Sequence, residues 1–317
     1  MMRNYKITSL CICTIIGAGF ATGRELLTYF AAYGTTGFIG MFISSILFSL
    51  VIHKTMSTNC TTINELLNPY PFNKIIILII QLFLLVLYSA MLSAGGEILN
   101  SIFNLNKITG AIITAILTTI IISKGYDSVA DLSEVLFIPI VIIIFAISIT
   151  TTEKAISIPS AAIITPKAIL SPLIYVSYNM LTTIPLLIGI PDKYLYKNCG
   201  NHVGIVIFIL ASMLLLPLYT HYSAIAGSTL PIMSLLSGGI KYLYQILLIL
   251  AIFSTAVSAA YSLNMAVKTK KHKLSISLIN ILALSISLLG FTQIVNKIYF
   301  IFGLSGIILL IILFTRK

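Results

Sequence analysis

The chain has 317 residues, of which 58% are hydrophobic and only 9% are charged. Soluble domains carry roughly 25% charged residues, so this composition excludes a water-soluble globular domain, and its apolar content excludes intrinsic disorder. The net charge of +11 does not indicate nucleic-acid binding, because membrane proteins concentrate positive charge in the loops on one side. The composition therefore predicts a polytopic, all-α membrane protein that contacts the lipid bilayer and no nucleic acid.

Ten apolar runs are long enough to cross a bilayer, which takes about 20 residues per helix. In chain order, we expect helices at residues 5–33, 37–53, 73–101, 108–123, 132–150, 167–190, 203–221, 240–267, 274–289 and 293–314. The first five helices make up residues 1–150, an extracytoplasmic connecting loop covers 151–166, and the second five make up 167–317. Because each half has an odd number of helices, the second half is inverted in the membrane, as in many secondary transporters.

The basic residues give an independent indication of topology. With ten spans, most loop Lys and Arg residues fall on the side of the N-terminus, and the other side holds only Lys107, Lys154, Lys167 and Lys241. Basic loops stay in the cytoplasm, so both termini are expected there and the protein is expected in the inner (cytoplasmic) membrane. The sequence does not predict the oligomeric state.

The first helix of each half contains helix-breaking residues. The first has Gly17, Gly19 and Gly23 within seven residues, and the sixth has a polar centre at residues 175–183 between Pro172 and Pro185. Paired interruptions of this kind expose main-chain groups to substrate and ions in inverted-repeat transporters, so we expect helices 1 and 6 to be interrupted. The alternative interpretation is close packing of small residues and a proline kink.

Two of these runs carry a family resemblance. The run GAGFATGRE at residues 17–25 resembles the first-helix signature of the YkvI-like bacterial membrane proteins, and YVSYN at residues 175–179 resembles their sixth-helix motif. That family is similar to the amino acid–polyamine–organocation superfamily. The resemblance implies the leucine-transporter (LeuT) fold, with ten helices in a 5+5 inverted repeat, but it supplies no substrate.

The resemblance also implies a sodium site between the first and eighth helices. The matching positions are the carbonyls of Cys13 and Ile16, the carbonyl of Ala251, and the hydroxyls of Ser254 and Thr255. Neutral oxygen ligands suit a monovalent cation. The alternative is that the two hydroxyls bond only to their own helix. The fifth helix has no lysine, which favours sodium over the lysine-dependent proton mechanism of some relatives.

A substrate site is expected beside the break in the first helix, where main-chain groups are free and a helix end favours a carboxylate. The residues expected to line it are Gly17, Ala18 and Gly19 on the first helix, Tyr178 and Asn179 on the sixth, and Tyr88 and Ser89 on the third. An amino acid fits such a site, and so does another small organic solute.

Of the charged residues within the predicted spans, we single out Arg24, Glu25 and Glu97. Each costs about 2.5–3.5 kcal/mol at the centre of a membrane helix, so a partner or an aqueous cavity is expected. A pair of Arg24 with Glu97 is geometrically possible, with Glu25 as the competing partner for either role, and the resemblance implies that Arg24 helps to close an outer gate. The alternatives are a proton-carrying or cation-binding carboxylate, and simple extension of the side chains to the headgroups.

These observations favour an alternating-access symporter driven by sodium for an amino acid or a similar solute. The alternatives are proton coupling through Glu25 or Glu97, and a solute-binding receptor on the same fold that does not transport. An enzyme is not expected, because the sequence has no nucleophile or phosphate-binding motif, and its Cys and His residues lack the spacing of a transition-metal site. Sodium is the only ion or cofactor that we expect to be required.

Overall fold

The fold is taken from a computed structural model, which describes residues 2–58, 60–152, 163–191, 196, 198–228, 230–267 and 272–316. The elements are α1 (Met2–Ile15), α2 (Ala18–Ala21), α3 (Arg24–Tyr29), η1 (Ala31–Tyr33), α4 (Thr35–Met56), α5 (Ile63–Leu67), α6 (Asn73–Phe103), α7 (Lys107–Ser123), α8 (Tyr126–Thr152), α9 (Pro166–Ile188), α10 (Cys199–Thr220), α11 (Tyr222–Ile225), α12 (Pro231–Leu235), α13 (Ile240–Val267), α14 (His272–Ser287) and α15 (Phe291–Thr315).

Each predicted span has a counterpart among these helices. Six helices, α4, α6, α8, α9, α10 and α13, are long and apolar enough to cross a membrane, and shorter apolar helices lie in α1, α7, α14 and α15. The fold is therefore that of a polytopic, all-helical membrane protein, as predicted. The fifth span begins six residues earlier than predicted, at Tyr126. Of the predicted connecting loop, residues 153–162 lie outside the described residues.

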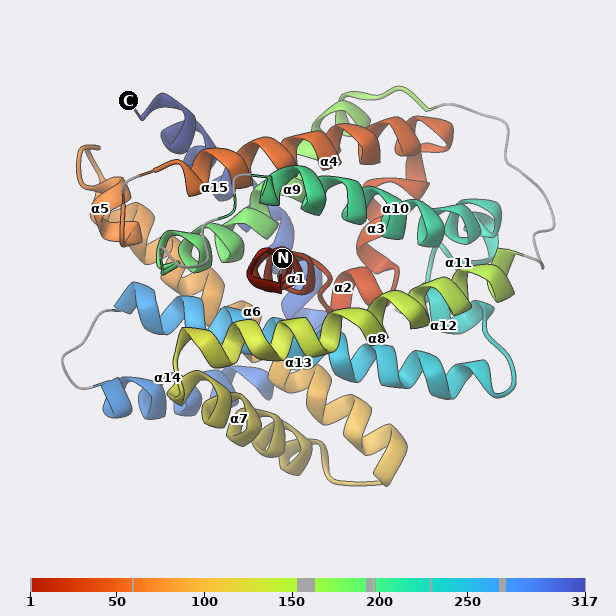
Figure 1. Ribbon diagram of the computed structural model, residues 1–317. Helices are drawn as coiled ribbons and strands as arrows, with labels where there is room; N and C mark the ends of the chain where they lie inside the picture. The colour runs from red at the N-terminus through yellow and green to blue at the C-terminus, as the bar shows by residue number, and fades with distance from the viewer. Residues whose placement is uncertain are drawn as a thin grey trace.

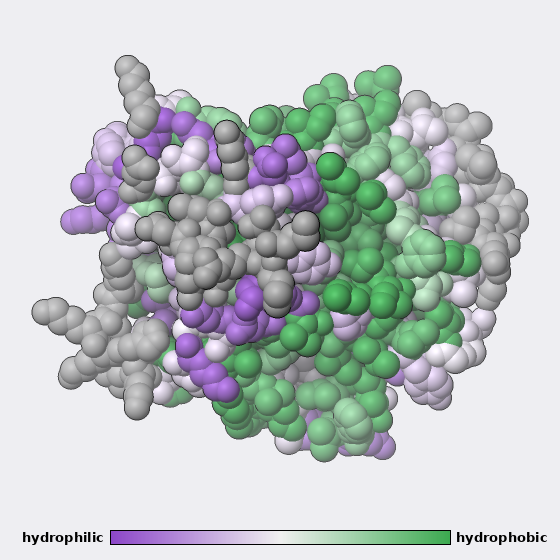
Figure 2. Space-filling view, viewed as in Figure 1, coloured by the Kyte–Doolittle hydropathy of each residue, from purple (hydrophilic) through white to green (hydrophobic). Residues whose placement is uncertain are grey.

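The outer surface is apolar where lipid would contact it. On α8, for example, Val135, Ile138, Ile142, Phe145 and Ile149 are all exposed, and their spacing places them on one face of the helix. Figure 2 shows hydrophobic residues gathered in a broad band on the visible face, with the strongly hydrophilic residues mainly at one side of it. An apolar stripe this large would be unstable in water, so it indicates contact with the bilayer.

The interior is formed mainly by α1, α9 and α13. In the most apolar stretch of α9 and of α13, 78% of the residues are buried, against 44–61% in the other four long helices. Figure 1 shows α1 in the middle of the bundle, with α9 and α10 on one side and α8 and α13 on the other. Equivalent helices of the two halves also pack together, α4 against α10 and α6 against α13.

The first span is interrupted, as predicted. The helix α1 ends at Ile15, Gly17 is extended with φ −85° and ψ −173°, and α2 begins at Ala18. A second turn follows at Gly23, whose φ of 78° lies in the left-handed region that favours glycine. The glycine-rich run therefore divides one membrane span into α1, the four-residue α2 and the six-residue α3.

The predicted interruption of the sixth span is wrong, because α9 is one continuous helix through Pro172 and Pro185. Asn179 and Thr183, between the prolines, bond to the helix itself, and Ser177 Oγ donates both within α9 and to the Gly303 carbonyl of α15. Asn179 Nδ2 donates to the Tyr175 carbonyl at 2.9 Å, and Thr183 Oγ1 donates to the Asn179 carbonyl at 3.0 Å. These bonds do not reach the carbonyls of Ala168 and Leu181, which Pro172 and Pro185 leave without an N–H donor, so α9 stays helical despite those two missing bonds.

Contacts at the helix ends place both termini on one side of the bundle. Lys54 Nζ, near the end of α4, donates to the Arg316 carbonyl at 3.2 Å, and Gly200 at the start of α10 lies against Ser49 and His53 of α4. On α1, Thr8 Oγ1 contacts Cys199 Sγ at 3.9 Å, which brings the N-terminal helix to the same end. An even number of spans has this consequence, so the contacts agree with the predicted topology.

The N-terminal end of α1 is joined to α8 by charge. Lys6 Nζ pairs with Asp131, to which it donates a hydrogen bond, and lies 3.6 Å from an Oε2 atom of Glu134. Both carboxylates lie near the start of α8, so the pair links the first and fifth spans at one end of the bundle.

Candidate functional site

A small cavity lies beside the break in the first span, near the middle of the bundle. It has a volume of about 20 Å³, which is enough for about one water molecule. Its walls come from α1, the break, α3, α6, α9 and α13, and the residues are Thr14, Ile15, Gly17, Ala18, Glu25, Phe83, Leu87, Met91, Tyr178, Asn179, Thr182 and Thr255. In this conformation the space is smaller than an organic solute.

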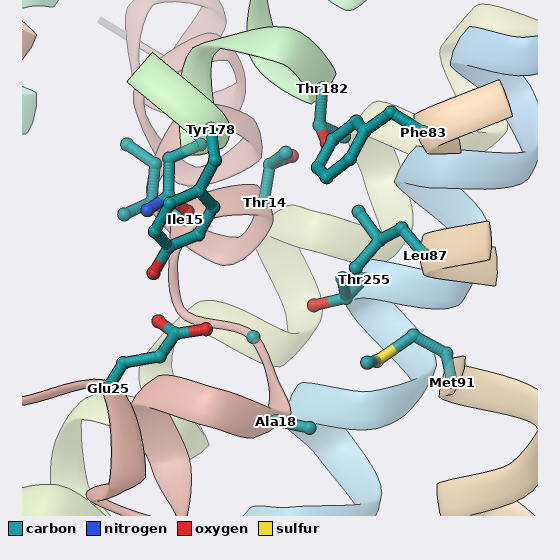
Figure 3. A pocket seen from close by; sticks show the side chains of 12 residues that line it. Thr14, Ile15, Ala18, Glu25, Phe83, Leu87, Met91, Tyr178, Thr182 and Thr255 are labelled. Atoms are coloured by element: carbon teal, nitrogen blue, oxygen red, sulfur yellow. The ribbon is translucent and has the colours of Figure 1, made fainter. Parts of the chain in front are cut away.

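Figure 3 shows that the cavity has two unlike walls. The carboxyl group of Glu25 and the phenol of Tyr178 point toward one another on one side, and Phe83, Leu87 and Met91 lie on the other. The latter three side chains are spaced four residues apart along α6, so they form one apolar stripe. Thr255 of α13 lies between the stripe and the break.

Of the main-chain carbonyls that lose their helical partner at the break, that of Cys13 bonds to α13. In a continuous helix the Gly17 N–H would bond to the Cys13 carbonyl. Here it bonds to the Ile15 carbonyl at 2.9 Å, and the Cys13 carbonyl instead accepts a hydrogen bond from Ser254 Oγ at 3.2 Å. The interruption therefore creates a direct polar contact between the first and eighth spans.

Four of the five residues predicted to bind sodium meet at this contact. Ser254 Oγ and Thr255 Oγ1 both donate to the Ala251 carbonyl, at 3.0 and 2.9 Å. The Cys13 carbonyl completes a group of four neutral oxygen atoms from two helices. The hydroxyls of Ser254 and Thr255 also agree with the alternative interpretation, in which they bond to their own helix, because both donate to a carbonyl of α13.

Ile16, the fifth predicted residue, is buried at the break, and its N–H donates to the Ile12 carbonyl at 2.8 Å. Within the described part of the chain, neither Ser254 nor Thr255 donates to the Ile16 carbonyl. Gly17 is close to this group, because a Cβ atom there would lie 3.1 Å from Thr255 Oγ1.

The structure brings only some of the predicted substrate residues to the cavity. Gly17, Ala18, Tyr178 and Asn179 line it, as expected from their place beside the break. Gly19, the residue after Ala18, does not line the cavity itself. Its backbone packs against the Glu25 side chain, which does, since a Cβ atom on Gly19 would lie 2.1 Å from Glu25 Oε1.

The expected wall on the third span is corrected by the structure. Tyr88 and Ser89 do not line the cavity: Tyr88 donates to Asn280 Oδ1 of α14 at 2.6 Å, and Ser89 donates to the Leu85 carbonyl of its own helix at 2.7 Å. The wall is the Phe83, Leu87 and Met91 stripe of the same helix. In a helix that is apolar all round, depth alone does not tell which face points inward.

The pair of Arg24 with Glu97 that the sequence allows is also corrected. Arg24 Nη1 donates to the carbonyls of Ala226 and Ser228, each at 3.0 Å, just after α11. Glu97 is half-buried on α6 and lies outside the residues that line the cavity. Of the three charged residues singled out, Glu25 is the one that the fold brings to the cavity.

Glu25 reaches the cavity because of the second turn of the broken span. The left-handed Gly23 redirects the chain, so α3 starts at Arg24 and carries Glu25 in its first turn. The side chain of Glu25 is only 7% exposed. In the described residues, no group of three or more His, Cys, Asp or Glu side chains has the arrangement of a metal site.

Comparisons with known proteins place this chain among membrane proteins. No family model matches the sequence. It is 24% identical to the uncharacterised membrane protein YkvI of Bacillus subtilis, over 94% of this chain and 91% of that protein.

Solved structures of transporters share the fold. A sodium-coupled sialic acid symporter has a TM-score of 0.64 and 13% identity, over 96% of this chain and 76% of its own. The nucleobase-cation-symport-1 family transporter Mhp1 has a TM-score of 0.62 and 12% identity, over 95% and 74%. A manganese transporter of Eremococcus coleocola has a TM-score of 0.61 and 12% identity, over 96% and 74%. The chain is a multi-pass membrane protein homologous to YkvI, and its structural neighbours are secondary transporters of the LeuT-type fold.

Proposed function

We propose that the protein is a secondary active transporter that carries a small organic solute by alternating access, coupled to sodium. The solute binds in the cavity beside the broken first span, and sodium binds between α1 and α13. The protein lies in the cytoplasmic membrane with both termini in the cytoplasm, on the basis of the distribution of Lys and Arg.

The observation that carries this proposal is the contact between the broken span and α13. The Cys13 carbonyl, which the break removes from the helix, lies 3.2 Å from Ser254 Oγ, and the Thr255 hydroxyl lies one residue further along α13. A sodium ion bound there would take oxygen ligands from both helices. Because Thr255 and Gly17 also line the solute cavity, bound sodium would fix one wall of that cavity. Such a shared wall couples the binding of ion and solute.

The first test is thermal unfolding of the purified protein in sodium and in potassium, followed with a thiol-reactive dye. All four cysteines are buried and free, so their reaction with the dye reports unfolding. Sodium at 100 times its dissociation constant should stabilise the native state by about 2.7 kcal/mol, and the double variant Ser254→Ala/Thr255→Ala should lose that difference. In liposomes, a sodium gradient should then drive uptake of the solute that enhances the shift.

A matched control is Ser44→Ala, because Ser44 is also buried and donates to a carbonyl of its own helix, Gly40, at 3.0 Å, but lies on α4. This variant should keep the sodium shift. The proposal fails if the double variant responds to sodium as the wild type does. If the protein binds a solute but a sodium gradient drives no uptake of it, the result would instead indicate a solute-binding receptor that does not transport.

A further inference from the structure

The cavity holds a buried acidic group without a basic partner. Glu25 is 7% exposed, and its carboxyl group packs against the backbone of Gly19. Among the described residues, the ion pairs within 4.0 Å all belong to Lys6, at the end of the bundle. Arg24, the neighbour of Glu25 in the sequence, is directed instead to the carbonyls of Ala226 and Ser228.

A carboxyl group in such a place either has a positive charge nearby or takes up a proton, because burying an unpaired charge is costly. The surroundings of Glu25 do not favour a transition metal, since the described residues hold no group of three or more His, Cys, Asp or Glu side chains that could bind one. The side chain that faces Glu25 in the cavity is instead the ring of Tyr178 (Figure 3). This ring packs against those of Tyr29 and Tyr175, which lie outside the cavity lining, at centroid distances of 5.8 and 5.7 Å. An aromatic ring beside a carboxylate suits an organic ammonium ion.

The opposite wall of the cavity favours an apolar group. Phe83, Leu87 and Met91 face Glu25 and Tyr178 across the cavity (Figure 3). A ligand with an ammonium group at one end and a short hydrocarbon chain at the other would match both walls. Burying the chain contributes about 0.8 kcal/mol per methylene group.

A substrate carboxylate finds little to bind. None of the twelve lining residues, all of them described, is basic. The helices after the break are only four and six residues long, which gives a weak dipole at their N-terminal ends. An α-carboxylate would also be repelled by Glu25 in a site this small.

We propose that the solute is a small primary amine with an apolar body, bound as its ammonium ion by Glu25, and not a zwitterionic amino acid. This rests on the proposed function, because it assigns the ligand of the same cavity. Glu25 and Tyr178 contact the ammonium group, and the stripe on α6 contacts the hydrocarbon.

The test compares n-butylammonium, n-butyrate and norvaline in the same thermal-unfolding assay, in both sodium and potassium. Norvaline is n-butylamine with an added α-carboxylate, so the pair isolates the effect of that group. We expect n-butylammonium to raise the melting temperature of the wild type, and n-butyrate and norvaline at the same concentration to have little effect. In Glu25→Gln, which keeps the shape but removes the charge, the affinity for n-butylammonium should fall about tenfold or more.

A second variant keeps the charge and moves it. In Gly19→Ala, the new methyl group would lie 2.4 Å from the Glu25 carboxyl carbon, so the flexible carboxyl end must shift. We expect weaker binding of n-butylammonium in a folded protein. The control is Gly40→Ala on α4, where the nearest atom would lie 3.3 Å away, on Pro172. This variant should bind n-butylammonium as the wild type does.

Two results would overturn the assignment. The first is that Glu25→Gln binds n-butylammonium as tightly as the wild type does, and the second is that norvaline raises the melting temperature of the wild type more than n-butylammonium does. If sodium stabilises the protein and no amine does, the amine assignment fails while the transporter proposal stands. If n-butylammonium binds through Glu25 and sodium has no effect, the assignment stands and sodium coupling fails.

Discussion

The broken span α1–α3 and the continuous helix α9 line the same cavity from the two halves of the chain, but they differ in where their polar groups bond. At the break, the Cys13 carbonyl leaves its helix and bonds to Ser254 of α13. In α9, the Asn179 and Thr183 side chains bond to carbonyls one turn earlier in α9 itself. The first arrangement offers another helix a carbonyl that has lost its helical N–H partner, whereas α9 stays helical and receives one bond from α13, from Ser262 Oγ to the Thr182 carbonyl at 3.1 Å.

The two segments also contain different breaking residues. Gly23 has a left-handed backbone that other residues adopt only with strain, so the direction of the chain at α3 depends on it. Pro172 and Pro185 each remove one hydrogen bond but keep a backbone angle that a helix accepts. In this protein the glycines interrupt a membrane span, and the prolines do not.

The largest expected effect is from Gly23→Ala. The left-handed conformation costs about 1–2 kcal/mol for a residue with a Cβ atom, and here that atom would lie 2.8 Å from Ile232 Cγ1 of α12. We expect a loss of about 2–3 kcal/mol in stability, measured as a lower melting temperature, together with a weaker sodium shift.

Gly189→Ala is the matched change at the end of α9. Gly189 has φ −82°, and a Cβ atom there would meet only the flexible end of Met265, at 3.2 Å. This variant should change the melting temperature little. Equal losses in the two variants would show that the turn at Gly23 has no special role.

Arg24→Met is expected to have the second largest effect, on the segment of α11 and α12, which contacts the break at Thr22 and Gly23. The variant removes two charge-assisted hydrogen bonds, to Ala226 and Ser228, but keeps the length of the side chain. Backbone amides of α11 and α12 should then exchange hydrogen about tenfold faster, which corresponds to about 1–2 kcal/mol.

Lys241→Met, at the start of α13, is the control for charge, because Lys241 is exposed. In Lys241→Met, hydrogen exchange of the backbone amides in α11 and α12 should match that of the wild type. Exchange of the α9 amides should be unchanged in both Arg24→Met and Lys241→Met. Unchanged exchange in Arg24→Met would mean that the contact between Ile232 N–H and the Thr22 carbonyl, at 3.2 Å, holds this segment alone.

The sequence was sufficient to predict the spans and the break in the first one. Apolar length fixes the spans, and the glycines at positions 17, 19 and 23 are a local signal for the break. The meeting of Cys13, Ala251, Ser254 and Thr255 came from the family resemblance, and the fold brings these residues together.

Contacts between distant segments were not predictable in the same way. The sequence allows a pair of Arg24 with Glu97, but main-chain carbonyls near α11 bind Arg24, and the sequence carries no signal for a carbonyl. The stripe of Phe83, Leu87 and Met91 was missed because apolar residues surround the whole of α6, so periodicity gives no inward face. Tyr88 was assigned to the cavity by depth, and it faces Asn280 on α14 instead.

The smallest expected effect is from Pro185→Ala. If α9 stays continuous during the working cycle, the alanine only restores one N–H group within a helix, and the stability should change by less than about 1 kcal/mol. The shifts in melting temperature with sodium and with n-butylammonium should persist. Thr182 and Asn179, which line the cavity about one and two turns before Pro185, keep their positions in this case.

The same variant separates a structural from a mobile role for the proline. If α9 instead opens at Pro185 when the cavity exchanges sides, restoring the N–H group would favour the continuous helix. The variant would then bind n-butylammonium normally but lose uptake driven by the sodium gradient. That result would mean that α9, like the first span, is interrupted during transport. The difference between the two segments would then belong only to the conformation described here.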